Sequence, residues 1–138
     1  MEKDRAYEKV LKRMLTLEHI GEFLYRALIL KAKDDNLRLI YDRLALNERE
    51  TAGYIEKEIL AIDKNHPIVI HGIILNLTRL ICGMLTAGQL AWILKCALKR
   101  RIYSKWYNRY KDHNQDFWYL LLNHENLQRE LLRSYWNN

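Results

Sequence analysis

Proline and glycine, the residues that shape tight turns, are scarce in this sequence. The 138 residues include one proline, Pro67, and five glycines. A fold made of many short strands needs frequent turns, and such turns depend on glycine and proline. The composition therefore predicts an all-α protein. The length is that of a single domain, residues 1–138, which is long enough to bury a core.

Cysteine is also rare, and a targeting segment is not evident. Cys82 and Cys96 are the two cysteines, so the Cys-x-x-Cys pair of many metal and redox motifs is absent. The first ten residues, MEKDRAYEKV, contain no apolar signal core. These features predict a cytoplasmic protein with reduced thiols.

The chain lacks a long apolar run that is free of polar residues. Its most apolar part, residues 67–98, is interrupted by side chains such as Arg79 and Lys95. A membrane-spanning helix needs about 20 mostly apolar residues. The nearest candidate, Leu80–Leu94, has 15 and contains Gln89. The sequence therefore favours a buried helix here over membrane association.

Catalytic motifs are missing too, since the sequence has neither a glycine-rich phosphate loop nor a Ser/His/Asp arrangement. The net charge is +6, and basic residues alternate with aromatic ones over residues 95–111. This pattern occurs in proteins that bind single-stranded nucleic acid. The preferred interpretation is that the aromatic rings pack in the core while the charges face solvent. The aromatic residues at 117–119 and 135–136 suggest either core packing or a homodimer face.

What the sequence does contain is helical periodicity along most of its length. Four long helices are expected, at about 3–33, 37–62, 87–111 and 114–135. They form two hairpins, about 3–62 and 87–135. The connector between them, about 63–86, includes a short apolar helix, although β-branched residues make a strand the alternative for 68–74. This connector is long enough to run the length of a bundle, which predicts a four-helix bundle with a long crossover between helices two and three.

An internal repeat links the two hairpins. YRALILKAKDDN at 25–36 and YSKWYNRYKDHN at 103–114 are 78 positions apart. The repeated Asp34 and Asp112 lie where each hairpin turns. Either Asp34 or Asp35 is expected to cap the second helix, and Asp112 the last one. Two similar hairpins would be related by a pseudo-twofold axis.

The first hairpin resembles that of the rubrerythrin-like branch of the ferritin-like superfamily. The matching features are Glu18 seven residues before Tyr25, the KDDN turn, and Glu48 followed by Ala52 and Tyr54. The second half is matched through the repeat and through NHENLQ at 123–128. This resemblance implies a ferritin-like bundle with a di-metal carboxylate site in its interior.

The family's metal ligands carry over only in part. Glu18, Glu48 and Glu125 match glutamate positions of the family. The other three positions are altered, to Thr51, Cys96 and Gln128. The register of the last helix is uncertain by one residue, because an ungapped repeat pairs Glu48 with Asn126 instead.

These losses affect the chemistry that the resemblance implies. Threonine and glutamine are weak ligands for iron, and a cysteine thiolate is soft. The favoured interpretation is a bundle that has lost its complete di-iron centre and acts as a structural or binding protein, not an enzyme. Its core carboxylates would then be satisfied by Arg100, Thr51, Gln128 or tyrosine hydroxyls.

The alternative is a residual site for one iron, manganese or zinc ion at Glu18, Glu48 and Glu125, with a role in redox chemistry or metal homeostasis. A complete dinuclear oxidase or peroxidase is the third interpretation. His19 and His124 are each expected to point roughly 100° away from the neighbouring glutamate. Glu22, on the face of Glu18, is expected to contact Arg100.

Overall fold

The computed structural model describes residues 2–65 and 72–136, and within these ranges all regular structure is helical. The all-α prediction is therefore confirmed for the described residues. The helices are α1 (Glu2–Lys31), α2 (Asp35–Ile62), α3 (Gly72–Met84), α4 (Ala87–Lys99), α5 (Ile102–Tyr110) and α6 (Gln115–Trp136). None of them is both long enough and apolar enough to cross a lipid bilayer.

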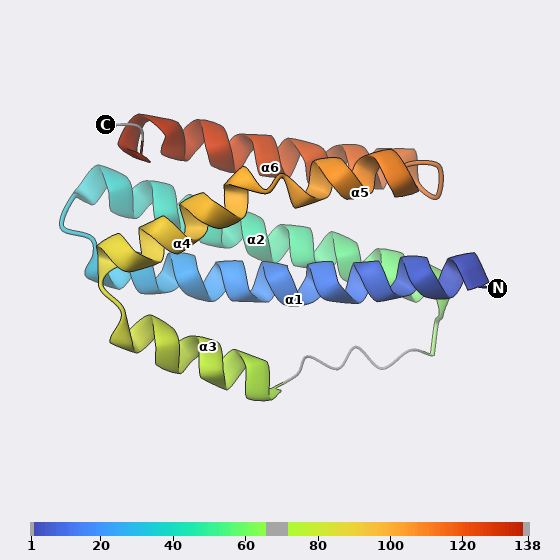
Figure 1. Ribbon diagram of the computed structural model, residues 1–138, viewed down its shortest axis with the longest axis horizontal. Helices are drawn as coiled ribbons and strands as arrows, with labels where there is room; N and C mark the ends of the chain where they lie inside the picture. The colour runs from blue at the N-terminus through green and yellow to red at the C-terminus, as the bar shows by residue number, and fades with distance from the viewer. Residues whose placement is uncertain (1, 66–71, 137–138) are drawn as a thin grey trace.

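Helices α1 and α2 form a tight hairpin whose turn is built by polar side chains. The Asp34 carboxylate accepts hydrogen bonds from the backbone N–H groups of Asn36, at 2.8 Å, and Leu37, at 3.3 Å. These bonds satisfy donors that would otherwise lack partners at the start of α2. Arg38 Nε donates to the carbonyl of Ala32 at 2.7 Å, just past the end of α1. The expected cap at Asp34 is confirmed, and the two helices lie side by side (Figure 1).

Helix α6 also starts with a side-chain cap, but at a different residue from the expected one. Asn114 Oδ1 accepts a hydrogen bond from the backbone N–H of Phe117 at 3.2 Å. The prediction of a cap at Asp112 was wrong, because the turn continues two residues further before the helix begins. This shift sets which side chains of α6 face the interior.

The apolar core consists of two clusters along the α1–α2 hairpin. One lies toward the N-terminal half of α1 and contains Tyr7, Leu11, Met14, Ile55 and Trp118 among others. The other lies toward the opposite end and contains Tyr25, Leu28, Tyr41, Leu44 and Leu90 among others. Residues between them on α1 and α2 include buried polar groups, so the interior is polar in its middle.

The aromatic residues of α5 and α6 pack largely in the first cluster. Tyr103, Tyr110, Phe117 and Trp118 are buried, and the Tyr110 and Trp118 rings stack with centroids 6.1 Å apart. Core packing is thus confirmed for Tyr103 and Tyr110, while Trp106 and Tyr107 are partly buried against the same cluster. For Phe117 and Trp118, core packing is the one of the two alternatives that the structure shows. Tyr119 is exposed, and the side chain of Trp136 lies outside the described part of the structure.

The helix predicted over 87–111 is interrupted, which the prediction of one continuous helix missed. Arg101 adopts a left-handed backbone conformation, with φ 47° and ψ 49°, between α4 and α5. Leu90 and Leu94 are buried on α4, whereas Tyr103 and Tyr110 are buried on α5. On an unbroken helix Leu90 and Tyr103 would point about 140° apart. The break turns both apolar faces toward the core.

Helix α3 lies along the outside of α1, and of its residues only Cys82 is fully buried (Figure 1). The predicted short helix within the connector is therefore confirmed for residues 72–84. The prediction of a buried helix at Leu80–Leu94 was wrong, because α3 ends at Met84, α4 begins at Ala87, and Leu80 and Met84 are exposed. The turn is seen as far as Asn65, and Pro67 and the rest of 66–71 lie outside the described residues. The strand alternative is wrong for residues 72–74, which are helical.

Arg101→Gly should stabilise the protein by about 0.5–1 kcal/mol, because glycine adopts the left-handed conformation without the steric cost that a side chain carries. Lys99→Gly, inside the last turn of α4, should instead destabilise it by about 0.5–1 kcal/mol. Urea unfolding of the two variants measures this difference. Equal destabilisation by both substitutions would contradict the break at Arg101.

Candidate metal centre

Three buried side chains from three helices converge in the polar middle of the interior. Glu18 of α1, Glu48 of α2 and His124 of α6 each place one ligand atom within 4.8 Å of the other two. His124 Nε2 lies 3.3 Å from Glu18 Oε2 and 3.6 Å from Glu48 Oε1. The structure thus brings together two of the three predicted metal ligands, with a histidine in place of the third.

The prediction that His124 points away from the other ligand positions was wrong. Its imidazole is fully enclosed, and Nδ1 lies 3.0 Å from the hydroxyl oxygen of Thr51. Thr51 stands where the resemblance places a histidine. The imidazole at this point of the interior therefore comes from α6, and Thr51 of α2 orients it through the contact with Nδ1.

The register of α6 explains why His124, and not Glu125, faces Glu18 and Glu48. Glu48 lies 14 positions after its cap residue Asp34, and Gln128 lies 14 positions after the cap residue Asn114. Counted from the two cap residues, Gln128 is the counterpart of Glu48. The family resemblance had instead assigned Glu125 to that position. The two assignments differ by three residues, close to one helical turn. His124, one turn before Gln128, then faces the same cluster.

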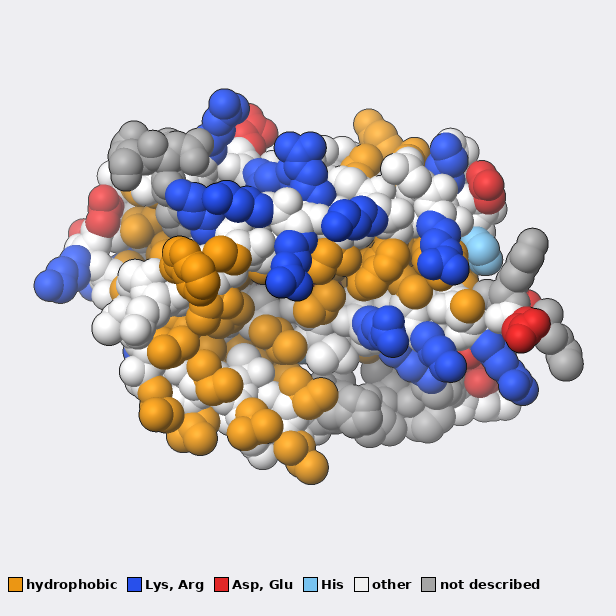
Figure 2. Space-filling model, in the orientation of Figure 1, with side chains coloured by type: hydrophobic (Ala, Val, Ile, Leu, Met, Phe, Trp, Pro, Cys, Tyr) orange, Lys and Arg blue, Asp and Glu red, His pale blue; other side chains and the backbone are white. Residues whose placement is uncertain are grey.

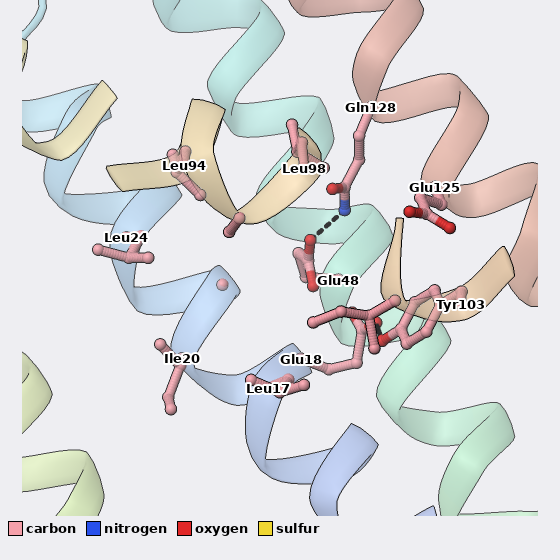
Figure 3. A pocket seen from close by; sticks show the side chains of 13 residues that line it. Leu17, Glu18, Ile20, Leu24, Glu48, Leu94, Leu98, Tyr103, Glu125 and Gln128 are labelled. Carbon is pink, nitrogen blue, oxygen red and sulfur yellow. Dashed lines mark hydrogen bonds between the residues drawn. The ribbon is translucent and has the colours of Figure 1, made fainter. Parts of the chain in front are cut away.

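Two further side chains hold the carboxylates in place. Gln128 Nε2 donates a hydrogen bond to Glu48 Oε1, drawn as a dashed line in Figure 3. Tyr103 of α5 donates its hydroxyl proton to Glu18 Oε1. Gln128 Nε2 also lies 2.8 Å from His124 Nε2. The cluster therefore links α1, α2, α5 and α6.

The charges in this cluster depend on one another. Burial raises the pKa of Glu48 well above its usual range, and the neighbouring negative charge of Glu18 raises it further. Burial also acts to raise the pKa of Glu18. Hydrogen bonds from Glu48, His124 and Tyr103, together with the charge of His124, outweigh this effect and lower that pKa. The two neighbouring carboxyl groups are therefore shifted in opposite directions, with the pKa of Glu48 raised and that of Glu18 lowered.

His124 carries the compensating positive charge. Burial acts to lower the pKa of His124, but the attraction of Glu18 and hydrogen bonds to both glutamates raise it to about 10. The positive charge that this favours on the imidazole offsets the negative charge that Glu18 places in the interior, which helps the fold tolerate two buried glutamates.

Glu125, predicted as the third ligand, lies beside the cluster. Its Oε1 forms an ion pair with the Arg129 guanidinium at 3.1 Å, and its Oε2 lies 3.5 Å from the Ser104 hydroxyl oxygen. It is not among the three residues whose ligand atoms converge. Burial raises the pKa of Glu125, and the charge of Arg129 partly opposes this rise.

The predicted positions of Cys96, Glu22 and Arg100 also need correction. Cys96 is half-buried and belongs neither to the three-residue cluster nor to the walls of the adjoining cavity. The repeat pairs Cys96 with Glu18, but the break at Arg101 separates the face of α4 from that of α5. Glu22 contacts Arg26 at 2.8 Å and Arg49 at 3.9 Å, not Arg100.

A cavity of about 150 Å³ adjoins the cluster, and its walls are mostly apolar. Figure 3 shows Glu18, Glu48 and Tyr103 at one part of it, with Leu24 and Leu94 further along. Tyr25, the repeat partner of Tyr103, is fully buried nearby. Burial raises the pKa of Tyr25 well above its usual range, as do the charges of Glu48 and Glu18.

Gly21 is a part of the site that the sequence reasoning overlooked. A Cβ atom at this position would lie 2.9 Å from the carboxyl carbon and Oε2 of Glu48. The Glu48 carboxyl group therefore packs directly against the backbone of α1. The available signal was a glycine inside a long helix, three residues after Glu18, where glycine has an unfavourable helix propensity.

The donor set fits one metal ion. Glu18 Oε2 is buried and makes no hydrogen bond of standard geometry to the described residues, although His124 Nε2 lies 3.3 Å away as an ion-pair partner. It faces an imidazole nitrogen and a second carboxyl group, the ligand types that manganese, iron and zinc share. The ligand positions that the resemblance implies for a second ion include Cys96, which lies outside the cluster, and Gln128, whose Nε2 donates to Glu48, so the converging atoms amount to one site.

No family model, curated protein or solved structure matches this chain in comparisons with known proteins.

Gly21→Ala should destabilise the protein by about 1–3 kcal/mol, because the added methyl group would overlap the Glu48 carboxyl group. Gly53→Ala is the matched control, since nothing lies within 4 Å of a Cβ atom there. It should stabilise the protein by about 0.5–1 kcal/mol through helix propensity. Urea unfolding of both variants measures the contrast, and equal stabilisation would show that Glu48 is not packed against Gly21.

Proposed function

We propose that this chain is a ferritin-like bundle that binds a single divalent transition-metal ion at Glu18, Glu48 and His124. The observation that carries the proposal is the convergence of three ligand atoms, from three different helices, within 4.8 Å in the buried interior. Metal-binding groups on separate helices meet at such a point only when the whole fold places them there.

The course of the helices supports the ferritin-like part of the proposal. Helix α1 packs against α2 and α4, and α6 packs against α2, α4 and α5. In Figure 1, α4 continues into α5 in the direction in which α2 runs. The four long helices of the proposed bundle are α1, α2, the interrupted α4–α5 and α6. The connector with α3 is the crossover between the second and third of them.

The remaining residues have defined tasks around the proposed ion. Tyr103 and Gln128 hold the carboxyl groups of Glu18 and Glu48. Thr51 holds the Nδ1 side of His124, so that Nε2 faces the two carboxyl groups. Partners of this kind fix the orientation of metal ligands and raise affinity. A bound ion would supply Lewis acidity and, for iron or manganese, one-electron redox chemistry for metal homeostasis or a redox role.

A second candidate function is supported by the same hydrogen bonds. Tyr103, Gln128 and Thr51 already give partners to Glu18, Glu48 and His124. The cluster would then be a metal-free polar core that fixes the packing of the helices, and the protein would be a structural or binding protein without enzyme activity. Metal-binding measurements separate the two functions.

The untagged protein is first stripped with a chelator and then given Mn²⁺, Zn²⁺ or, under anaerobic conditions, Fe²⁺. It should retain about one ion per chain. Removing a direct ligand in His124→Ala or Glu48→Gln should weaken binding by at least ~100-fold. Thr51→Val, which keeps the side-chain volume but removes the bond to Nδ1, should weaken it by about 10–100-fold. Elemental analysis after dialysis and competition with a chromogenic chelator measure these values.

His19→Ala and Glu22→Gln are the controls, since both residues are near the ligands in sequence but outside the cluster. Both variants should bind metal as the parent does. A parent protein that binds no metal, and whose melting temperature is unchanged by all three ions, would remove the metal function and leave the metal-free polar core.

Metal binding should release protons near neutral pH. The pKa of His124 is raised to about 10, and the pKa of Glu48 is raised as well, so protons on these groups compete more strongly with a cation than they would on exposed side chains. Affinity should therefore rise with pH, by about tenfold per pH unit for each proton released. Calorimetry in buffers with different ionisation enthalpies gives the number of protons, and binding without proton release would contradict this charge assignment.

A further inference from the structure

Helix α3 presents a continuous apolar stripe to solvent. Five large hydrophobic residues at positions 73, 77, 80, 81 and 84 share one face of the helix by their spacing. Their exposed fractions are high: Ile73 77%, Leu77 53%, Leu80 60%, Ile81 49% and Met84 76%. An amphipathic helix normally turns such a stripe inward, so here the usual orientation is reversed.

The opposite side of α3 attaches the helix to α1 without using this stripe. Cys82 is buried in the core cluster of that end. The Lys31 ammonium donates to the carbonyl of Leu85 at 2.6 Å, and the Arg79 guanidinium lies 4.8 Å from the Phe23 ring centroid. The outer hydrophobic residues are therefore not needed for the contact with α1.

The charges of the chain are segregated around the same region. From residue 64 to residue 111 the sequence has nine Lys and Arg residues and neither Asp nor Glu. The rest of the chain has 14 basic and 17 acidic residues, so the net positive charge comes entirely from 64–111. This segment contains α3, α4 and α5.

The apolar stripe and the basic residues lie on one face of the molecule. Figure 2 shows hydrophobic side chains gathered in the region of α3, and Lys and Arg side chains over the neighbouring part of the same face. On α4 and α5, the residues Lys99, Arg100, Arg101 and Lys105 line a surface hollow of about 370 Å³. A flat, negatively charged surface could touch the stripe and these cations together.

We propose that this face docks on an anionic lipid surface, with the stripe of α3 in the interfacial region and the cations of α4 and α5 on lipid headgroups. Interfacial helices combine an apolar face with electrostatic attraction to anionic lipids, and each basic residue near the surface adds to binding. The proposal is independent of the metal site, which lies in the interior.

Two other occupants fit the face less well. A symmetric dimer through α3 would place two copies of the segment with nine basic and no acidic residues near each other, which costs electrostatic energy. Nucleic acid would match the cations but would leave the five aliphatic and methionine side chains of the stripe without an apolar partner.

Sedimentation with sucrose-loaded vesicles tests the proposal on the full-length, untagged chain. Vesicles of phosphatidylcholine with about 30% phosphatidylserine should bind the protein at least ~10-fold more tightly than pure phosphatidylcholine vesicles, because cationic surfaces are attracted to anionic lipids. Raising the salt from about 0.1 M to about 0.5 M should weaken binding, because it screens that attraction.

Variants on the face have matched controls elsewhere. Ile73→Ser with Leu80→Ser should lower the partition coefficient by at least ~10-fold, whereas Leu120→Ser, at an exposed position of α6, should leave it unchanged. Lys99→Glu should lower the partition coefficient several-fold, because it reverses one charge on the docking face. Arg43→Glu on α2 makes the same charge change outside residues 64–111 and should have a smaller effect. Circular dichroism verifies that each variant is folded.

The proposal is overturned if the parent protein does not bind the anionic vesicles at low salt. It is equally overturned if the α3 double variant binds as well as Leu120→Ser. Light scattering that finds a dimer dissolved by Leu80→Ser, without vesicle binding, would assign the face to a second copy of the chain. Retention on single-stranded nucleic acid without vesicle binding would assign it to that partner instead.

Discussion

The arrangement of the interior depends on placing two carboxyl groups side by side away from water. Glu18 and Glu48 are both buried, and two adjacent buried negative charges would be strongly unfavourable. His124 resolves this by carrying a positive charge between them, while Tyr103 and Gln128 donate hydrogen bonds. Helices α1, α2 and α6 contribute buried residues to both apolar clusters, whereas α5 contributes to the first of them. These apolar contacts hold the helices that carry the polar groups.

Much of the helical framework could be predicted from the sequence because it follows from local rules. The Asp34 cap, the apolar spacing on α1 and α2 and the shortage of glycine and proline act within a few residues of each other. Glu18 and Glu48 were identified through the family resemblance of the first hairpin, and the structure places both on the buried faces of α1 and α2. That these side chains meet residues of the second half of the chain could be expected only from the repeated hairpin, because such contacts are far apart in the sequence.

The rest of the site could not be read from spacing alone, because it depends on two shifts of helix register. The first moves the cap of α6 from Asp112 to Asn114, and with this register His124 and Gln128 face Glu48 while Glu125 faces Ser104 and Arg129. The second is the left-handed residue between α4 and α5, which separates Cys96 from Tyr103. The second shift left a signal in the sequence, since the apolar residues before and after Arg101 lie on opposite faces of any continuous helix.

The chain thus places charge in its interior and an apolar stripe on its surface, and the two features lie on different elements. The buried cluster uses α1, α2, α5 and α6, whereas the stripe belongs to α3, which adds one fully buried residue to the core. Because α3 is joined to the body mainly through α1, polar substitutions on its outer face remove no packing from the cluster. Effects of substitutions at the two places should be additive, as expected for sites without shared partners. On the two proposals, the apolar stripe of α3 serves contact with a lipid surface, and the buried polar cluster serves binding of a metal ion.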